Sequence, residues 1–358
     1  MIKLNKSILI TGGAGFVGSN LCIGLKQKYP NYTIVALDNL RRRGSELNLS
    51  RLKEHEITFV HADIRNQEDL EDLPSFDILI DASADPSVLA GINSPLMPLI
   101  NSNLLGTVHC LELAKKRSAA FIFLSTSRVY PIDTLENAAY IEQETRYAWT
   151  DNQAIHGISS RGIREDFPIS GSRSFYGSTK LASELLIDEY HALTGMKTIV
   201  NRCGVLSGPW QMGKIDQGVL VLWLARHYFK GSLKYIGFEG KGKQTRDVLH
   251  IDDLVRLIDW QIHHIDQVNG ATFNVGGGLD VSFSLLELTE LCQEVTGNKI
   301  QILPELQTRT ADIKIYITDN TKVTSTTGWS PTKSMKDLVQ DTYNWMKENE
   351  KSLKQILN

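Results

Sequence analysis

The stretch Ser7-Ile8-Leu9-Ile10-Thr11-Gly12-Gly13-Ala14-Gly15-Phe16-Val17-Gly18 decides the fold of this chain. A short apolar strand runs directly into three spaced glycines, and a helix is expected to begin near Gly15. In such a unit the first glycine allows a tight turn, the second lets backbone approach a pyrophosphate, and the third packs the helix on the strand. The helix N-terminus attracts the anion. We therefore predict a dinucleotide site that includes Gly12, Gly15, Phe16, Val17 and Gly18.

Short apolar runs alternate with helical stretches over the first 200 residues. The expected strands are 7–11, 33–37, 57–60, 77–82, 120–125 and 197–201. Strands that are apolar almost throughout are typical of a parallel sheet with helices on both faces. At 358 residues the chain also exceeds the usual size of a single core. We predict an α/β fold: a Rossmann-type doubly wound parallel sheet over 1–202 and a smaller C-terminal α/β substrate lobe over 203–358, allowing return crossings.

The second half contains two clear amphipathic helical patterns, 284–296 and 334–348. The latter opens with Ser334 within reach of Asp337, which predicts a capping pair. The stretch 132–173 is long and rich in charge and serine, and two readings of it stay open: a lid over a substrate or an ordinary surface loop.

Composition argues against several classes of function. Hydrophobic residues make up 42%, charged residues 22%, and the net charge is -3, so no bulk field attracts nucleic acid or an anionic membrane. No apolar run reaches the roughly 18 residues of a membrane span. We expect a cytoplasmic protein. The four cysteines lack a C-x-x-C pair and read as buried reduced thiols, and the pair His263-His264 has no third ligand in view, so no metal site is predicted.

The second strand ends near Asp38, 20 residues after Gly18. A carboxylate at this position accepts hydrogen bonds from ribose hydroxyls and repels a 2′-phosphate, which favours NAD over NADP. The run Arg41-Arg42-Arg43 qualifies this, because an arginine could accommodate the phosphate or simply be solvated. Asp63 follows the third strand, where it would meet the adenine edge or end the strand in a plain turn. The complete predicted cofactor site adds Asn39, Arg43, Asp63, Ile64, Ser83, Ala84 and Asn103.

A tyrosine and a lysine stand four positions apart in Tyr176-Gly177-Ser178-Thr179-Lys180. On a helix this spacing places both side chains on one face. A phenol is a weak base at its usual pKa of about 10, and a neighbouring ammonium stabilises the phenolate. The pair alone occurs by chance in many helices. Its weight comes from Leu124-Ser125-Thr126-Ser127, because hydroxyls at the carboxyl edge of a parallel sheet line the ligand crevice.

These motifs together resemble the extended short-chain dehydrogenase/reductase family that acts on nucleotide sugars, over essentially the whole chain. The resemblance implies that Thr126, four residues before Tyr130, acts with Tyr176 and Lys180, which also contact NAD. It implies that Arg246, in Arg246 to Leu254, holds a nucleotide diphosphate together with Arg309. It also implies pairing through the helices that flank the tyrosine, as a homodimer or homotetramer.

Within that family, a further set of segments resembles CDP-tyvelose (CDP-paratose) 2-epimerases. The segments are Asp38 to Gly44, Asn201-Arg202, Gly208-Pro209-Trp210-Gln211, Asp216-Gln217-Gly218 and Gly240 to Asp247. The predicted substrate residues are Ser127, Asn201, Gln211, Gln217, Arg246 and Arg309. Two departures are Asp81-Ala82-Ser83-Ala84, where the family has His-Leu-Ala-Ala, and Ser207, where an aromatic residue is usual.

The resemblance implies epimerisation at C2 of a CDP-linked deoxyhexose. Oxidation at C4 would acidify C3 and C5 but not C2, so inversion at C2 requires hydride removal from C2 itself and its return to the other face. The alternatives are a UDP-glucose-type 4-epimerase and a 4,6-dehydratase; Ser127-Arg128 after Thr126, where a dehydratase typically has Asp-Glu, counts against the latter. A non-catalytic dinucleotide sensor would not need the tyrosine, lysine and threonine together.

Overall fold

The computed structural model describes residues 5–92, 94–213 and 217–357. It divides into two compact units that alternate along the chain. The first comprises 1–126, 175–202 and 254–272, and the second comprises 127–174, 203–253 and 273–358. The expected boundary after residue 202 is thus one of several crossings. The stretch 127–174, which we had expected in the first domain, belongs to the second unit. Its hydrogen bonds join it to strands and helices there.

A seven-stranded sheet, in the order β14-β10-β5-β4-β1-β2-β3, lies mostly in the first unit; the last residue of β10 and residues 273–275 of β14 count with the second unit. Its strands are β1 (Ser7–Thr11), β2 (Thr33–Asp38), β3 (Thr58–His61), β4 (Ile78–Asp81), β5 (Ala120–Thr126), β10 (Thr198–Cys203) and β14 (Ala271–Val275). The pairs β1/β2, β1/β4, β2/β3 and β4/β5 are parallel. The order reverses between β1 and β4, which creates the switch point where such sheets bind ligands. This confirms the doubly wound prediction, and all six expected strands lie within two residues of their expected bounds.

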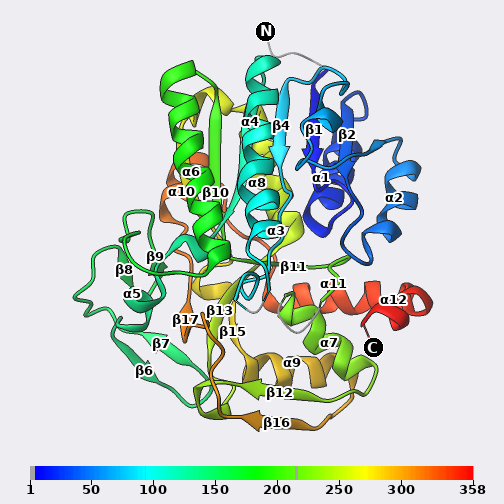
Figure 1. Ribbon diagram of the computed structural model, residues 1–358. Helices are drawn as coiled ribbons and strands as arrows, with labels where there is room; N and C mark the ends of the chain where they lie inside the picture. Colours follow the sequence, from blue (N-terminus) through cyan, green and yellow to red (C-terminus); the bar gives the residue numbers. More distant parts are fainter. Residues whose placement is uncertain (1–4, 93, 214–216, 358) are drawn as a thin grey trace. The chain divides into compact units, whose positions relative to one another are not determined.

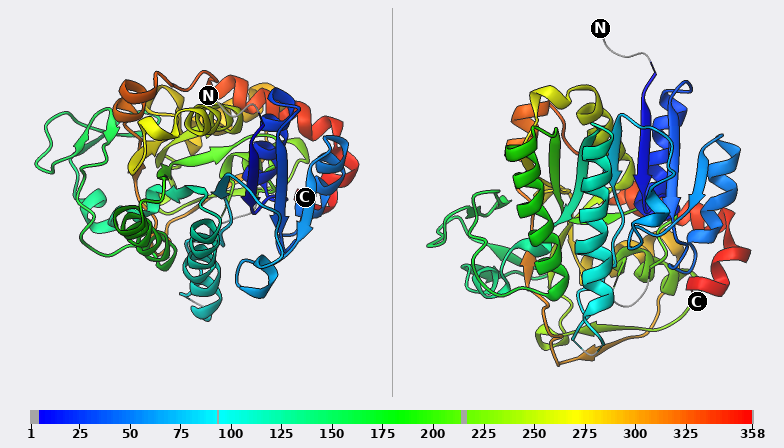
Figure 2. Two further views of the ribbon diagram at one scale, coloured as in Figure 1. Left: turned by 90° about the horizontal axis from the view of Figure 1, so that it is seen from above. Right: turned by 45° about the horizontal axis from the view of Figure 1, so that its top comes forward.

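Helices cover both faces of this sheet. α4 (Gly106–Lys116) and α6 (Phe175–Thr194) lie on one face, and α1 (Phe16–Lys28) and α8 (Ile251–His263) lie on the other (Figures 1 and 2). The remaining helices of the unit are α2 (Asn48–Glu54), α3 (Met97–Ile100) and the π-helical turn η3 (Asn101–Leu105). α1 buries Leu21 and Leu25 completely, and their four-residue spacing places them on one face of the helix.

The second unit contains smaller sheets and the remaining helices. β13 (Thr245–His250) pairs with β11 (Val205–Ser207) and β17 (Ile315–Tyr316) in parallel and with β15 (Ser282–Ser284) antiparallel. Two-stranded sheets join β12 (Leu233–Ile236) to β16 (Ile302–Glu305), β6 (Tyr140–Glu142) to β7 (Tyr147–Trp149) and β8 (Ile158–Ser159) to β9 (Gly162–Ile163). The helices are α5 (Ile132–Glu136), α7 (Val219–Tyr228), α9 (Leu285–Thr296), α10 (Thr321–Thr327), α11 (Met335–Glu348) and α12 (Glu350–Leu357).

The two expected C-terminal helices are present with clear start signals. Ser334 caps α11 by accepting a hydrogen bond from the Asp337 backbone N–H at 3.2 Å, as the sequence predicted. Ser284 and Glu287 form a reciprocal capping box at the start of α9.

All four cysteines are free and buried, which confirms the expectation of reduced thiols. Cys22 and Cys110 belong to the first unit, and Cys203 and Cys292 to the second. Over the described ranges, no helix is both long and apolar enough to span a bilayer.

Candidate active site

The glycine turn joins β1 to α1 in the first unit. Gly12 has φ +62°, and its carbonyl accepts a hydrogen bond from the Gly15 N–H at 2.9 Å. A Cβ at Gly18 would lie 2.1 Å from the Gly12 oxygen, and a Cβ at Gly13 would lie 2.6 Å from the Ala36 Cα. Side chains are therefore excluded, and Gly15 at the N-cap leaves the α1 terminus bare. This is a cradle that fits the pyrophosphate of a dinucleotide.

Asp38 ends β2 beside this turn. Its carboxylate accepts hydrogen bonds from the backbone N–H groups of Ala14 at 3.1 Å and Leu40 at 2.8 Å. Burial raises the pKa of Asp38, while these backbone hydrogen bonds act to lower it. The predicted ribose acceptor is therefore anchored to the glycine turn. Arg43 is exposed in the stretch that follows.

The other residues predicted at the adenosine end already have protein partners. Asp63 pairs with Arg65 and accepts a hydrogen bond from the Asn39 amide at 2.9 Å. The hydrogen bond from Arg65, above all, holds the pKa of Asp63 well below its usual range. Ile64 is buried, and its carbonyl is 2.8 Å from His109 Nδ1. Asp63 is thus a paired carboxylate, and binding the adenine amine would require it to share its oxygens.

Ser83 and Ala84 follow the end of β4, and Asn103 lies in η3. The Ser83 hydroxyl donates to Asp81 at 2.7 Å. Asn103 is completely buried, and its side-chain amide brackets the backbone of Asp85, accepting from the N–H at 2.7 Å and donating to the carbonyl at 3.0 Å. Both polar side chains therefore fasten the turn around Ala84.

The three predicted catalytic residues all lie in the first unit. Thr126 is the last residue of β5 and is buried. Tyr176 and Lys180 begin α6, one helical turn apart on the same face, and α6 packs against β5. Lys180 is 1% exposed, and its ammonium lies 3.8 Å from the centre of the Phe123 ring on β5. A cation held against an aromatic face in a buried position is well fixed beside the tyrosine.

Sequence reasoning missed Glu184, which lies one turn beyond Lys180. Its carboxylate accepts the Ser125 hydroxyl and pairs with Arg202 of β10, with Nη2 to Oε2 at 2.8 Å. The side chains of Arg202 and Glu184 are only 10% and 4% exposed. The hydroxyl of Ser125 is therefore used to hold α6 on β5, which leaves its neighbour Thr126 as the candidate for chemistry. The signal in the sequence was the four-residue step Tyr176, Lys180, Glu184.

Two of the predicted substrate residues, Asn201 and Gln211, use their side-chain amides in hydrogen bonds within the protein. Asn201 is completely buried and exchanges two hydrogen bonds with Gln261, at 2.9 and 2.8 Å. The Gln211 amide accepts from Ser207 at 2.9 Å and donates to the Leu206 carbonyl at 2.9 Å. Gln217 immediately precedes Gly218, the N-cap of α7, while Asp216 lies outside the described residues. A substrate role for Asn201 would require breaking its amide pair.

Arginines converge on the stretch 309–314 of the second unit. Arg246 donates to Asp312 at 2.9 Å and to the Lys314 carbonyl at 3.1 Å, and Arg128 donates to the Ala311 carbonyl at 3.1 Å. Burial above all lowers the pKa of Arg246 to about 10; the charge of Asp312 acts against this, and the charge of Arg128 acts with it. Arg309 opens the same stretch, and Ser127 precedes Arg128. Arg128 was not among the predicted site residues, although it follows Ser127 directly.

The stretch 132–173 is tied into the second unit at several points. Arg146 forms an ion pair with Glu287 and donates to Ser282 at 2.8 Å. The Glu165 carboxylate accepts from the Asn274 N–H at 2.7 Å. These bonds make the stretch an integral part of that unit.

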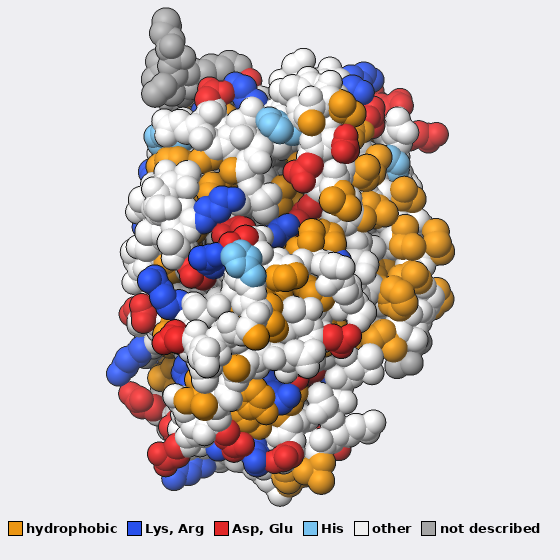
Figure 3. Space-filling model, turned by 90° about the vertical axis from the view of Figure 1, so that its left-hand side faces the viewer, with side chains coloured by type: hydrophobic (Ala, Val, Ile, Leu, Met, Phe, Trp, Pro, Cys, Tyr) orange, Lys and Arg blue, Asp and Glu red, His pale blue; other side chains and the backbone are white. Residues whose placement is uncertain are grey.

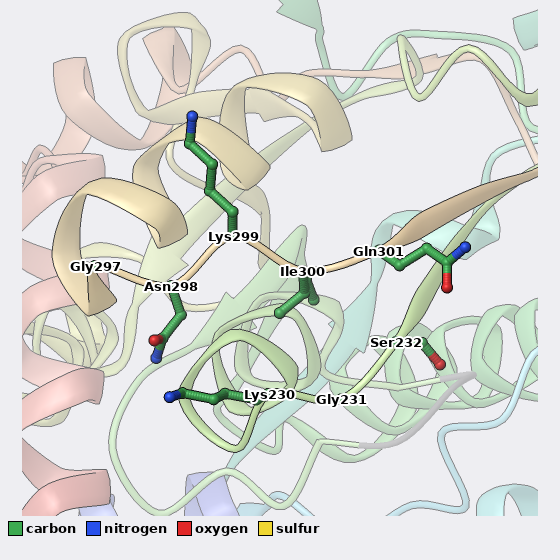
Figure 4. Close-up of a pocket in the computed structure, with 8 residues that line it drawn as sticks. All are labelled: Lys230, Gly231, Ser232, Gly297, Asn298, Lys299, Ile300 and Gln301. Atoms are coloured by element: carbon green, nitrogen blue, oxygen red, sulfur yellow. The ribbon is translucent and has the colours of Figure 1, made fainter.

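A separate polar cleft of about 650 Å³ lies where α7 and α9 end (Figure 4). It is lined by Lys230, Gly231, Ser232, Gly297, Asn298, Lys299, Ile300 and Gln301. Helix C-termini carry partial negative charge, which the two lysines offset. None of the predicted site residues lines this cleft, and we assign it no role. The described ranges contain no group of three or more His, Cys, Asp or Glu suited to a metal ion.

Known proteins similar to this chain are nucleotide-sugar epimerases and dehydratases. The chain is 33% identical to a CDP-paratose 2-epimerase from Salmonella typhi, over 94% of this chain and 98% of that protein. Solved structures of similar fold include a UDP-glucuronic acid 4-epimerase from Bacillus cereus in complex with UDP-glucuronic acid and NAD, at TM-score 0.78 and 25% identity over 96% of this chain and 99% of that one.

A second solved structure is a dTDP-glucose 4,6-dehydratase from Bacillus anthracis in complex with NAD. Its TM-score is 0.76, at 25% identity over 98% of this chain and 99% of that chain. The model of the NAD dependent epimerase/dehydratase family matches residues 8–276. With the glycine cradle, Asp38 and the buried Tyr176–Lys180 helix in place, the chain belongs to the NAD-dependent epimerase/dehydratase family and uses NAD as its cofactor.

Proposed function

We propose that this protein epimerises a nucleotide-diphospho-sugar at C2, with a CDP-linked deoxyhexose as substrate. The observation that carries the proposal is the near end-to-end match with a relative named CDP-paratose 2-epimerase, at 33% identity. The segment after Thr126 adds support. It reads Ser127-Arg128, without the acidic pair that a dehydratase would need at that point.

The proposed chemistry assigns one role to each residue of the catalytic set. Bound NAD supplies a hydride acceptor that can return the hydride to the sugar. The Tyr176 phenol oxygen takes the proton from the sugar hydroxyl and later gives it back. Lys180, buried over Phe123, stabilises the phenolate form by its charge. The Thr126 hydroxyl orients the same sugar oxygen by a hydrogen bond.

We assign the residues that would hold NAD by their position. The glycine turn would receive the pyrophosphate, and Asp38 would accept hydrogen bonds from the adenosine ribose. The Asp38 carboxylate would repel a 2′-phosphate on that ribose, which favours NAD over NADP. The residues Asn39, Asp63 and Ile64 would border the adenine.

The arginines around 309–314 are proposed to hold the diphosphate of the substrate. Guanidinium groups bind phosphate oxygens in pairs, and the chain has a net charge of -3, so the attraction must be local. We propose direct contact by Arg309 and Arg128. Arg246, which donates to Asp312 and to the Lys314 carbonyl, would hold the stretch in shape and contribute its charge.

A panel of CDP-, UDP- and GDP-sugars tests the proposal. Each is incubated with the enzyme in deuterated water and, separately, as C2- or C4-deuterated donor. Epimerisation at C2 should keep the carbon-bound deuterium in a product inverted at C2, with no solvent deuterium at C3 or C5. Inversion at C4 would establish the 4-epimerase alternative, and solvent label at C5 with loss of water would establish a dehydratase.

We further propose that the protein forms a homodimer through α6. Three leucines on this helix are exposed, namely Leu185 at 57%, Leu186 at 37% and Leu193 at 79%, and Met97 of α3 is 57% exposed. Figure 3 shows hydrophobic side chains gathered on one side of the face that it presents. An exposed apolar patch of this kind marks a contact surface. Light scattering should give twice the chain mass, and Leu185→Glu should halve it.

A further inference from the structure

Asp81, at the end of β4, is a completely buried carboxyl group in the first unit. Its Oδ1 accepts hydrogen bonds from the Thr11 hydroxyl at 2.7 Å and from the hydroxyl and N–H of Ser83 at 2.7 and 3.2 Å. Its Oδ2 accepts from the Thr107 hydroxyl at 2.9 Å. All four donors are uncharged. A buried carboxyl group is costly unless its oxygens are fully bonded, so these donors are what makes the position tolerable.

Thr107 connects Asp81 to a second buried residue, Asn103. The Thr107 hydroxyl lies 3.1 Å from the Asn103 carbonyl, which also accepts the Ser183 hydroxyl of α6 at 3.0 Å. The Asn103 side chain reaches the Thr179 hydroxyl of α6 at 3.4 Å. A continuous polar chain therefore runs from β1 to α6. We call it the buried polar network: Thr11, Asp81, Ser83, Asn103, Thr107, Thr179 and Ser183.

The two ends of the buried polar network lie next to the two parts of the predicted site, the glycine turn and the catalytic residues of α6. Thr11 is the residue before the glycine turn, and Thr179 is the neighbour of Lys180. The turn after β4 also touches the glycine turn directly, because a Cβ at Gly12 would lie 2.9 Å from the Ala82 oxygen. Ser83 and Asp85, on either side of Ala84, are each held by one member of the network.

We propose that Asp81 is a positioning residue whose hydrogen bonds hold the glycine turn, the turn at 82–85 and the catalytic helix α6 in one arrangement that is ready to receive NAD. The sequence supplies a reason to look here, since Asp81-Ala82-Ser83 replaces the His-Leu-Ala that the family resemblance leads one to expect. The inference concerns the cofactor site and holds whichever sugar is the substrate.

Geometry and charge can be separated at this position. In Asp81→Asn the remaining oxygen can keep the three donors of Oδ1, and the new NH₂ can donate to Thr107, whose own proton then goes to the Asn103 carbonyl. In Asp81→Ala the hydroxyl and N–H of Ser83 lose this acceptor, and the hydroxyls of Thr11 and Thr107 keep only their longer contacts, to the Ser83 hydroxyl and the Asn103 carbonyl, both at 3.1 Å. If Asp81 acts by position, Asp81→Asn should bind NAD⁺ within about threefold of the unaltered protein, and Asp81→Ala should bind it roughly tenfold or more weakly.

Calorimetric titration with NAD⁺, and the rise in melting temperature that saturating NAD⁺ produces, measure this without any sugar substrate. Wild-type affinity in a folded Asp81→Ala protein would overturn the proposal. Equal losses in Asp81→Ala and Asp81→Asn would also overturn it, because they would assign the effect to the charge.

A matched pair of threonines covers the case in which Asp81→Ala does not fold. Thr107 and Thr342 are both buried helical residues whose hydroxyls bond the carbonyl four residues earlier, but only Thr107 also bonds Asp81. Thr107→Val should weaken NAD⁺ binding about fivefold, and Thr342→Val, in the second unit, should not change it. Equal NAD⁺ affinity in the two variants would refute the positioning role.

Discussion

The two units hold their functional residues in different ways. In the first unit, the candidate catalytic and cofactor residues stand at the ends of regular strands and at the start of α6, and buried hydrogen bonds fix them. In the second unit, the arginines proposed to bind phosphate gather at 309–314, an irregular stretch in which Ala311 has a left-handed φ of 63°. The first arrangement suits chemistry that needs fixed geometry, and the second suits recognition of a charged group. Substitutions in the first unit should therefore affect turnover, and those in the second should affect substrate affinity.

The largest effect is expected from Tyr176→Phe. Removing the phenol oxygen deletes the proposed acid and base, so kcat should fall by about a thousandfold, while NAD⁺ affinity stays within a few fold. Steady-state assays on the substrate identified by the sugar panel measure the loss, and calorimetry checks the cofactor. Near-normal turnover by this variant would remove Tyr176 from the mechanism.

Glu184→Ala comes next, as a test of how firmly α6 is held. It would leave the Arg202 guanidinium buried without its carboxylate, which costs about 3 kcal/mol or more of unfolding free energy. Denaturant unfolding of the apoprotein measures this cost.

The matched control for that experiment is Glu184→Gln, which keeps an acceptor for Ser125 and should lose less than the alanine variant. A loss below about 1 kcal/mol in Glu184→Ala would show that the pair contributes little to the first unit.

In the second unit, Asp247 gives a pH-dependent contrast. It is completely buried, and burial raises its pKa to about 6, against the hydrogen bonds that its carboxylate accepts from Thr318 and Gly278, which act to lower it. Because the folded state holds this proton more tightly than an exposed aspartate of pKa about 3.9, the stabilisation is complete below about pH 4. It is lost as pH rises through 6, for a total of about 2–3 kcal/mol.

Urea unfolding between pH 4 and 8 tests this, followed by tryptophan fluorescence, since five of the six tryptophans belong to the second unit. Asp247→Asn should flatten the decline. A wild-type curve that runs parallel to the variant's at all pH values would contradict the assignment.

The smallest effect is expected from Arg309→Ala. Loss of one phosphate contact should raise the KM for the nucleotide sugar by about tenfold, with kcat and NAD⁺ affinity nearly unchanged. Lys299→Ala, at the cleft of Figure 4, is the control and should leave KM unaltered. A fall in kcat alone would mean that Arg309 acts in the chemistry and would erase the contrast between the units.

The same contrast explains what the sequence could predict. The strands of the first unit are continuous apolar runs, and the glycine turn and Asp38 follow them at fixed spacing, so local pattern was sufficient. The buried polar network was beyond reach, because Thr11 and Asp81 are 70 residues apart and nothing in either neighbourhood indicates the partner. The sequence did not predict that 127–174 belongs to the second unit, for the same reason. The hydrogen bonds of this stretch to Glu287 and Asn274 span more than 100 residues.

The buried cysteines can report on the opening of each unit separately. Cys22 and Cys110 are completely enclosed in the first unit and Cys292 in the second, while Cys203 is buried at the end of β10, where the chain passes from the first unit to the second. Burial raises the pKa of the thiols of Cys22 and Cys292 far above the usual value, so these thiols are unreactive while the fold is closed. Alkylation followed by peptide mass spectrometry would therefore time the opening of each unit separately, in one sample and without an introduced label. Added NAD⁺ should then slow the modification of Cys22 and Cys110 more than that of Cys292.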